Sequence, residues 1–217
     1  MARIVFDLDG TLIDSAPDLH ATANAVLAQE GAPPVTLAEA RDFIGHGTPV
    51  FVARMRAARG IPDSDQARLL AAFMARYETA VDLTRPYPGA PEALAALGAA
   101  GHRLGLCTNK PMAPCRAILA HLGLDSHFEV VLGGDSLPQR KPDPAPLHAT
   151  LAALGDGQTL YVGDSETDAE TATRAGVPFL LFTEGYRQSP LEALPHTATF
   201  AQFADLPGLV GRLLETL

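Results

Sequence analysis

Two aspartates separated by one residue, Asp7 and Asp9, follow a short apolar run at positions 4–6. A run without polar alternation is typical of a strand buried on both faces of a parallel sheet. Gly10 allows a sharp turn after the second aspartate because it can adopt a positive φ. Two carboxylates at the carboxyl end of a central strand lie where open α/β sheets bind ligands, and they repel each other unless a cation or shared proton is present. A divalent metal held by oxygen atoms is the simplest way to relieve this repulsion. The alternative interpretation is an ordinary turn, since Asp and Gly are common turn residues.

Polar residues also follow a second predicted strand, at positions 103–107, and occupy a later loop. The hydroxyl and backbone N–H groups of Thr108 and Asn109 can bind phosphate oxygens at that strand end. Lys141 can place a positive charge beside a phosphate oxygen and beside the carboxylate of Asp7. We therefore expect Thr108, Asn109 and Lys141 to bind phosphate at the sheet edge that carries Asp7.

A third group of polar residues follows the predicted strand at 159–162 and opens a helix. Asp164 can reach a metal, and Asp168 can orient Lys141 or a metal-bound water. Ser165 lies between them and is typical of a helix cap. Each group by itself is common turn or cap chemistry, but all of them in order at predicted strand ends indicate one site.

The elements that position these residues alternate between strand and helix from residue 90 onward. Helices of 10 to 15 residues between strands are typical of right-handed crossovers, so we predict an α/β fold with a doubly wound parallel sheet. The predicted strands are 4–6, 103–107, 129–132, 159–162 and 179–182. The predicted helices are 90–100, 112–122, 144–154 and the segment from 165 to 175.

Residues 15–83 are predicted to contain helices and no strands. The first helix covers 18–29, and Thr36 with Glu39 forms a capping-box pattern that opens a second helix ending at Phe43. A third helix restarts at Thr48 with Pro49 as its first residue, and a fourth runs from position 63 or 64 towards Ala80. The Pro- and Gly-rich segment 84–89 then leads back to the sheet. We expect a core domain of residues 1–14 and 84–217 and an inserted helical domain of residues 15–83.

Composition limits the class of protein and its partners. The chain has 217 residues, 47% of them hydrophobic, and a net charge of −9. This acidity argues against a nucleic acid or a membrane surface as a partner. The two cysteines, Cys107 and Cys115, are too few for a disulfide framework and are expected to be buried thiols in the cytoplasm. The sequence leaves the oligomeric state open, a homodimer among the options.

The motifs resemble those of the haloacid dehalogenase superfamily, most of whose members are phosphatases. Residues 7–12 (DLDGTL) are similar to its nucleophile motif, and the further motifs follow in order at Thr108, Lys141 and 163–168. The resemblance covers essentially the whole chain, including a helical cap between the first two motifs. The chain most resembles the phosphoglycolate phosphatases, in the segments 44–47, 87–89, 104–111, 133–135 and 185–186.

This resemblance implies a Rossmann-like core, a small phosphate ester as substrate and Mg²⁺ as cofactor. It implies that Asp7 attacks phosphorus and forms an aspartyl-phosphate, while Asp9 acts as acid and then as base. It places Mg²⁺ on the Asp7 side chain, the Asp9 carbonyl and the Asp164 side chain, with Lys141 as a further catalytic group.

We expect the cap to determine which substrate is bound, because the predicted core residues contact only the phosphate group. Gly45, His46, Gly47 and Thr48 form a turn before a helix N-terminus, which can bind an anion such as the carboxylate of 2-phosphoglycolate. The other interpretation is an ordinary interhelix loop with Thr48 as N-cap. His46 departs from the resemblance, since Asn is expected there.

Other functions compete with this hypothesis. Phosphatases for other sugar or nucleotide phosphates are the nearest alternative. A phosphomutase would isomerise a phosphosugar instead of hydrolysing it. A 2-haloacid dehalogenase needs neither a metal nor an acid two residues after its nucleophile, so Asp9 and Asp164 argue against it. The complete motif set disfavours a binding module without activity.

Overall fold

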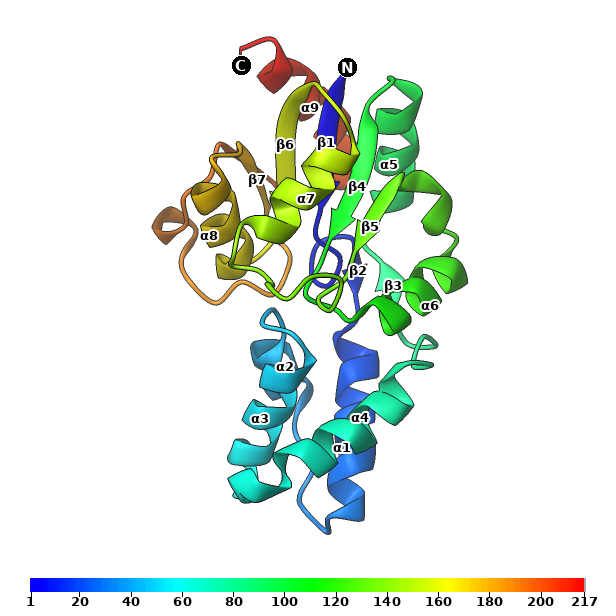
Figure 1. The fold of residues 1–217 in the computed structure, drawn as a ribbon, viewed down its shortest axis with the longest axis vertical. Helices are drawn as coiled ribbons and strands as arrows, with labels where there is room; N and C mark the ends of the chain where they lie inside the picture. The colour runs from blue at the N-terminus through cyan, green and yellow to red at the C-terminus, as the bar shows by residue number, and fades with distance from the viewer. Residues whose placement is uncertain (217) are drawn as a thin grey trace.

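The computed structural model describes residues 1–216; Leu217, which the predicted core domain includes, lies outside the described residues. Six parallel strands form one sheet in the order β5-β4-β1-β6-β7-β8, with β1 (Ala2–Phe6) near its centre (Figure 1). The other strands are β4 (Arg103–Cys107), β5 (Val130–Leu132), β6 (Gln158–Gly163), β7 (Phe179–Phe182) and β8 (Ala198–Phe200). The predicted α/β fold with a doubly wound parallel sheet is confirmed.

Helices cover both faces of this sheet, as the apolar β1 predicts. Ile4 and Phe6 pack in one buried cluster with residues of α5 (Ala90–Ala99), α6 (Met112–Leu122) and α9 (Leu206–Leu214). Val5 points to the opposite face and packs in a second cluster with α7 (Ala145–Ala153) and α8 (Glu166–Ala175). Because β1 is buried on both sides, its carboxyl end is a fixed base for the residues that follow it.

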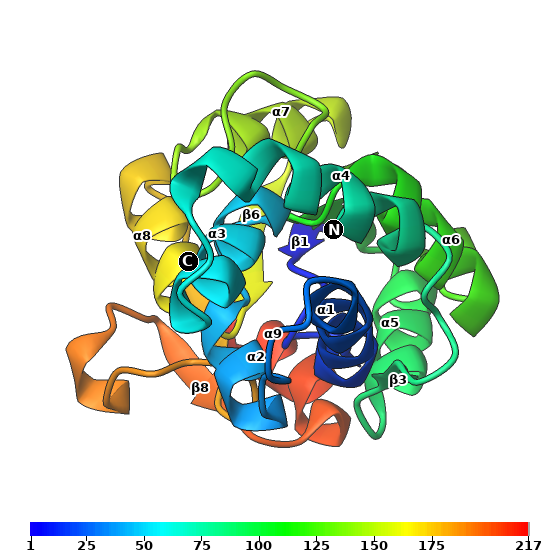
Figure 2. The ribbon, with the colours of Figure 1, turned by 90° about the horizontal axis from the view of Figure 1, so that it is seen from below.

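The register of the sheet aligns the carboxyl ends of β1, β4 and β6. Phe6, the last residue of β1, is paired with Leu106 of β4 and Val162 of β6. The residues that follow these positions therefore emerge together at one edge. A helical layer lies against that edge, and Figure 2 shows it in front of the strand ends.

This helical layer consists of α1 (Ala16–Gln29), α2 (Leu37–Phe43), α3 (Thr48–Ala58) and α4 (Gln66–Tyr77). It has its own hydrophobic cluster, in which Phe51 stacks near Phe73, with 5.2 Å between ring centroids. The capping box of Thr36 and Glu39 is present at the start of α2. The separate cluster supports the division into a 15–83 cap and a core, which stays a prediction. Within residues 1–216, no helix combines the length and apolar character needed to cross a membrane.

Several predicted boundaries were wrong. The third cap helix begins at Thr48 with Pro49 second, and its N-cap is Gly47 at φ 85°, not Thr48. The fourth begins as a 3₁₀ turn at Asp63–Asp65 and ends as α4 at Tyr77, short of Ala80. β8 and α9, which follow the strand at 179–182, were not predicted. β8 is a three-residue edge strand, too short to give a periodic pattern.

The two connections between cap and core form a short ribbon that the sequence analysis did not predict. β2 (Ile13–Asp14) pairs antiparallel with β3 (Arg85–Pro86). Next to it, the buried carboxylate of Asp18 accepts hydrogen bonds from the backbone N–H of Leu83 at 3.2 Å and of Thr84 at 2.8 Å. It also accepts one from the Thr84 hydroxyl at 2.6 Å. Asp18 thus ties the start of the cap to the returning chain.

Replacing Asp18 by alanine should lower the free energy of unfolding by about 2–4 kcal/mol, because it leaves buried donors without partners. Urea unfolding of the two proteins measures the difference. Asp82→Ala is the matched control, since Asp82 is exposed in the same connection. A loss no larger than that of the control would contradict the role of Asp18.

Candidate active site

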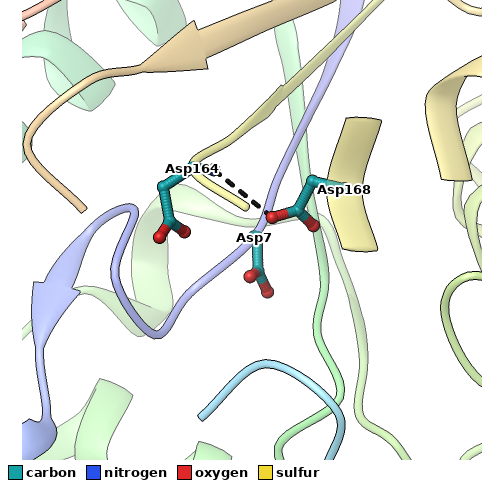
Figure 3. Close-up of side chains that lie close together, drawn as sticks. All are labelled: Asp7, Asp164 and Asp168. Carbon is teal, nitrogen blue, oxygen red and sulfur yellow. Dashed lines mark hydrogen bonds between the residues drawn. The ribbon is translucent and has the colours of Figure 1, made fainter. Parts of the chain in front are cut away.

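The site lies at the carboxyl edge of the sheet, beneath the cap. Asp7 follows β1, Thr108 follows β4, and Asp164 follows β6. These residues are 7%, 4% and 1% exposed. Figure 3 shows Asp7 and Asp164 converging with Asp168 from the first turn of α8. Three carboxylates so close together in a buried place require compensating charge.

Lys141 supplies part of that charge from the loop before α7. Its Nζ lies 2.8 Å from Asp7 Oδ1 and 2.7 Å from Asp168 Oδ1. The Tyr161 hydroxyl accepts a further hydrogen bond from it at 2.9 Å. Burial opposes the charge on Lys141, but attraction to Asp168 and Asp7 outweighs it, and the pKa of Lys141 lies above its usual range.

Of the three carboxylates, Asp168 accepts the most hydrogen bonds from the protein. Its Oδ1 accepts from Lys141 and from the Tyr161 hydroxyl, the latter at 2.6 Å. Its Oδ2 accepts from the Ser165 hydroxyl at 2.6 Å and from the backbone N–H of Asp164 at 3.3 Å. Burial opposes ionisation, but Lys141 and these hydrogen bonds prevail, and the pKa of Asp168 is lowered. Asp168, held by its capping box with Ser165, therefore orients Lys141.

Asp164 keeps more capacity to bind a cation. Its Oδ1 accepts from the Thr11 hydroxyl and its Oδ2 from the Tyr186 backbone N–H, each at 2.7 Å. Burial, with the charges of Asp168 and Asp7, raises the pKa of Asp164 well above its ordinary value. Gly10 at φ 87° packs against this carboxylate, since a Cβ there would lie 2.4 Å from Asp164 Oδ2.

The donor set fits a hard divalent cation. Asp7, Asp164 and Asp168 each offer an oxygen within 4.8 Å of the other two. Asp7 Oδ1 is buried 2.8 Å from the ammonium of Lys141, and it meets no other hydrogen-bond donor within the described chain. Burial raises the pKa of Asp7 to about 7, although Lys141 opposes the rise. A cation bound by oxygen atoms would relieve this repulsion and keep Asp7 ionised.

Asp9 turns its side chain away from this cluster. Its Oδ1 lies 3.1 Å from Nζ of Lys110, which is 6% exposed. Lys110 also donates to the hydroxyl of Tyr77, the last residue of α4, and lies 4.4 Å from the centre of that ring. Burial opposes the charge on Lys110, but Asp9 and Tyr77 outweigh it, and its pKa lies above the usual range. The predicted metal contact of Asp9 is its backbone carbonyl, and that stays a prediction.

Sequence reasoning missed several of these residues. Lys110 lies two positions after Thr108 at the same strand end, and this position was the signal that could have found it. Tyr161 is buried within β6, and its role depends on contacts with residues distant in the sequence. Nothing local in the sequence distinguishes Thr11 or Tyr186 as partners of Asp164.

The cap loop divides the predicted residues between two cavities. Gly45, Gly47 and Thr48 line a cavity with Asp7, Asp9, Thr108, Asn109 and Lys110. His46 lines a neighbouring cavity instead, together with Arg54 and Asp164, and its Nδ1 lies 3.2 Å from the Thr167 hydroxyl. Burial and Arg54 lower the pKa of His46, so its ring is neutral at neutral pH.

The side chain of Asn109 has a role that the sequence analysis did not predict, while phosphate binding by its backbone N–H stays a prediction. Its Nδ2 donates to the carbonyl of Gly45 at 3.0 Å and to that of Lys141 at 2.9 Å. The side chain thus fixes the cap loop to the loop of Lys141. Thr108 keeps its hydroxyl proton available, since its Oγ1 accepts from the Lys110 backbone N–H at 3.1 Å.

Comparisons with known proteins agree with the motifs described above. Residues 4–182 match the family model of haloacid dehalogenase-like hydrolases. The chain belongs to the haloacid dehalogenase-like hydrolases. It is 56% identical over 217 residues to a phosphoglycolate phosphatase of Cereibacter sphaeroides, covering 99% of this chain and 100% of the relative. A phosphoglycolate phosphatase of Rhodobacter capsulatus is 45% identical, with 95% of each chain covered.

A solved structure agrees with this membership. A predicted phosphoglycolate phosphatase from Haemophilus somnus 129pt superposes with a TM-score of 0.89 at 33% identity, covering 95% of this chain and 96% of that one. The expectation of a haloacid dehalogenase-type phosphatase is therefore confirmed, and this chain is a phosphoric monoester hydrolase. Members of this family generally use a divalent metal, in keeping with the acidic cluster.

Asp168→Asn should lower kcat for a phosphate monoester about 10²-fold, because Lys141 loses the carboxylate that holds it in position beside Asp7. Tyr161→Phe is the control: it removes only a hydroxyl, and Lys141 keeps both anionic partners, so the loss should stay below about tenfold. Steady-state kinetics of the two variants compare them. Equal losses would contradict the positioning role of Asp168.

Proposed function

We propose that this chain hydrolyses 2-phosphoglycolate to glycolate and phosphate with Mg²⁺ as cofactor, through an aspartyl-phosphate on Asp7. The observation that carries the phosphoryl chemistry is the Asp7 carboxylate, paired with Lys141 at 2.8 Å, at a cavity that Thr108 also lines. The phosphoglycolate assignment is supported by relatives of that name at up to 56% identity over the full chain.

In this mechanism Asp7 is the nucleophile that attacks phosphorus in line with the leaving oxygen. Asp9 protonates that oxygen as glycolate departs and later removes a proton from the water that hydrolyses the aspartyl-phosphate. The Thr108 hydroxyl and the Lys141 ammonium bind the non-bridging oxygens, where negative charge is held during transfer. Asp168 and Ser165 keep Lys141 in place throughout.

Mg²⁺ would be held by the Asp7 side chain, the Asp9 backbone carbonyl and the Asp164 side chain. When bound, it neutralises charge on the phosphoryl group and allows the dianion to approach Asp7. Asp164 is the most available of the other carboxylates, because both oxygens of Asp168 are already engaged by several donors.

The cap loop is proposed to enclose the substrate. Gly45, Gly47 and Thr48 form one wall of the cavity above Asp7, and Asn109 fastens that wall to the core. Exclusion of water there strengthens every electrostatic contact with the phosphoryl group. His46 belongs to the same loop and attaches it to the core through the Thr167 hydroxyl. A cytoplasmic location, the absence of nucleic acid or membrane partners, and a homodimer stay predictions.

Asp7→Asn should reduce activity at least about 10³-fold while leaving the fold intact, because the amide has nearly the same shape and is a poor nucleophile. Steady-state assays and circular dichroism measure the two properties. Retention of more than about a tenth of the wild-type rate would exclude Asp7 as the nucleophile.

Chelation with EDTA should abolish activity, and added Mg²⁺ should restore it, because Asp7 and Asp164 would otherwise repel the phosphate dianion. The assay is repeated after dialysis into metal-free buffer and titration with Mg²⁺ or Ca²⁺. Full activity in excess EDTA would remove the metal from the mechanism.

The substrate assignment predicts a preference for a carboxylate. Relative to 2-hydroxyethyl phosphate, which has a hydroxyl in its place, 2-phosphoglycolate should have a kcat/KM higher by about 10- to 150-fold, the value of one charge-assisted hydrogen bond. Equal values for the two esters would refute the phosphoglycolate assignment and favour another small phosphate ester.

A further inference from the structure

The cavity above Asp7 has one cationic side chain among its described lining residues, that of Lys110. Lys141 is paired with Asp7 and Asp168, and the proposed mechanism assigns it to the phosphoryl group. The cap loop contributes Gly45, Gly47 and Thr48, which have no charge. A substrate with a second anionic group would therefore find its counter-charge at Lys110.

The position of Lys110 relative to Asp9 fixes where that second group would lie. Its Nζ is 3.1 Å from Asp9 Oδ1. In the proposed mechanism Asp9 must be within hydrogen-bond reach of the leaving oxygen. In 2-phosphoglycolate a single methylene separates this oxygen from the carboxylate. A cation adjacent to Asp9 is consequently within reach of the carboxylate when the leaving oxygen is in place.

The receptor for this group would be completed by the cap. Lys110 donates a hydrogen bond to the Tyr77 hydroxyl. The proton of that hydroxyl is therefore free to be donated to another acceptor. Tyr77 is buried at the end of α4, whereas Lys110 follows β4 in the core. The two groups meet only when the cap lies against the core.

We propose that Lys110 and the Tyr77 hydroxyl together bind the carboxylate of the substrate and select small phosphate monoesters with a carboxylate next to the ester carbon. This inference rests on the proposed function, and it assigns the carboxylate to a lysine of the core and a tyrosine of the cap, instead of to the N–H groups of the cap loop. Because the receptor is divided between the two parts, a substrate with a carboxylate also holds the cap closed.

The test is the ratio of kcat/KM for 2-phosphoglycolate to that for 2-hydroxyethyl phosphate. Lys110→Gln removes the charge but keeps a donor for Asp9, and Lys110→Met removes both. Loss of support for Asp9 lowers both rates, so the ratio isolates the carboxylate. Both variants should lower it by about 10- to 150-fold, mainly through KM. Tyr77→Phe should lower it by about 2- to 13-fold, the value of a neutral hydrogen bond.

Arg140→Gln is the matched control, because Arg140 is exposed and lines a different cavity beside Thr48. The ratio of kcat/KM values for this variant should equal that of the wild type. A wild-type preference that survives unchanged in the Lys110 variants would overturn the inference and leave the proposed function standing. The absence of any preference in the wild type would overturn both. Should the Lys110 variants fail to fold, an unchanged ratio in Tyr77→Phe overturns the divided receptor and a reduced one supports it.

Discussion

The ion triad of Asp7, Lys141 and Asp168 is the interaction on which the rest of the site depends. Its members are buried, and Lys141 lies 2.8 Å from one carboxylate and 2.7 Å from the other. Such charges persist in a protein interior only when each has a partner of opposite sign and sufficient hydrogen bonds. Removal of one partner leaves the others uncompensated. The capping box of α8 and the Tyr161 hydroxyl supply the remaining contacts, so the triad fixes the ends of β1 and β6 and the loop of Lys141.

In this arrangement Asp7 has fewer hydrogen bonds than Asp168, which leaves its carboxylate available for reaction. Asp168 accepts hydrogen bonds from Lys141, Tyr161 and Ser165, whereas Oδ1 of Asp7 has only the ion pair with Lys141 among the described residues. A carboxylate that lines a cavity and lies next to a cation suits a nucleophile that must also bind a metal. The cap adds three contacts from distant parts of the chain: Asn109 with Gly45, Lys110 with Tyr77, and Thr167 with His46.

Much of the fold and part of the site were predictable from local sequence. The apolar run before Asp7 predicted a strand buried on both faces, and the strand ends carry Thr108 and Asp164 where alternation of strand and helix placed them. The pairing of Lys110 with Tyr77 was not predictable, since 33 residues separate them and nothing local in the sequence indicates that they meet. The ribbon of β2 and β3 has two residues a strand, and β8 has three, too few for a periodic pattern.

The central claim is that phosphate is transferred to Asp7. An Asp9→Asn variant given p-nitrophenyl phosphate tests it most directly: the phenolate leaves without an acid, while hydrolysis of the aspartyl-phosphate lacks its base. Acid quenching and mass spectrometry should then find one phosphoryl group on the peptide that contains Asp7, and none in the double variant that also carries Asp7→Asn. A protein that turns over the ester without any such adduct, or with the adduct on another residue, would contradict the account.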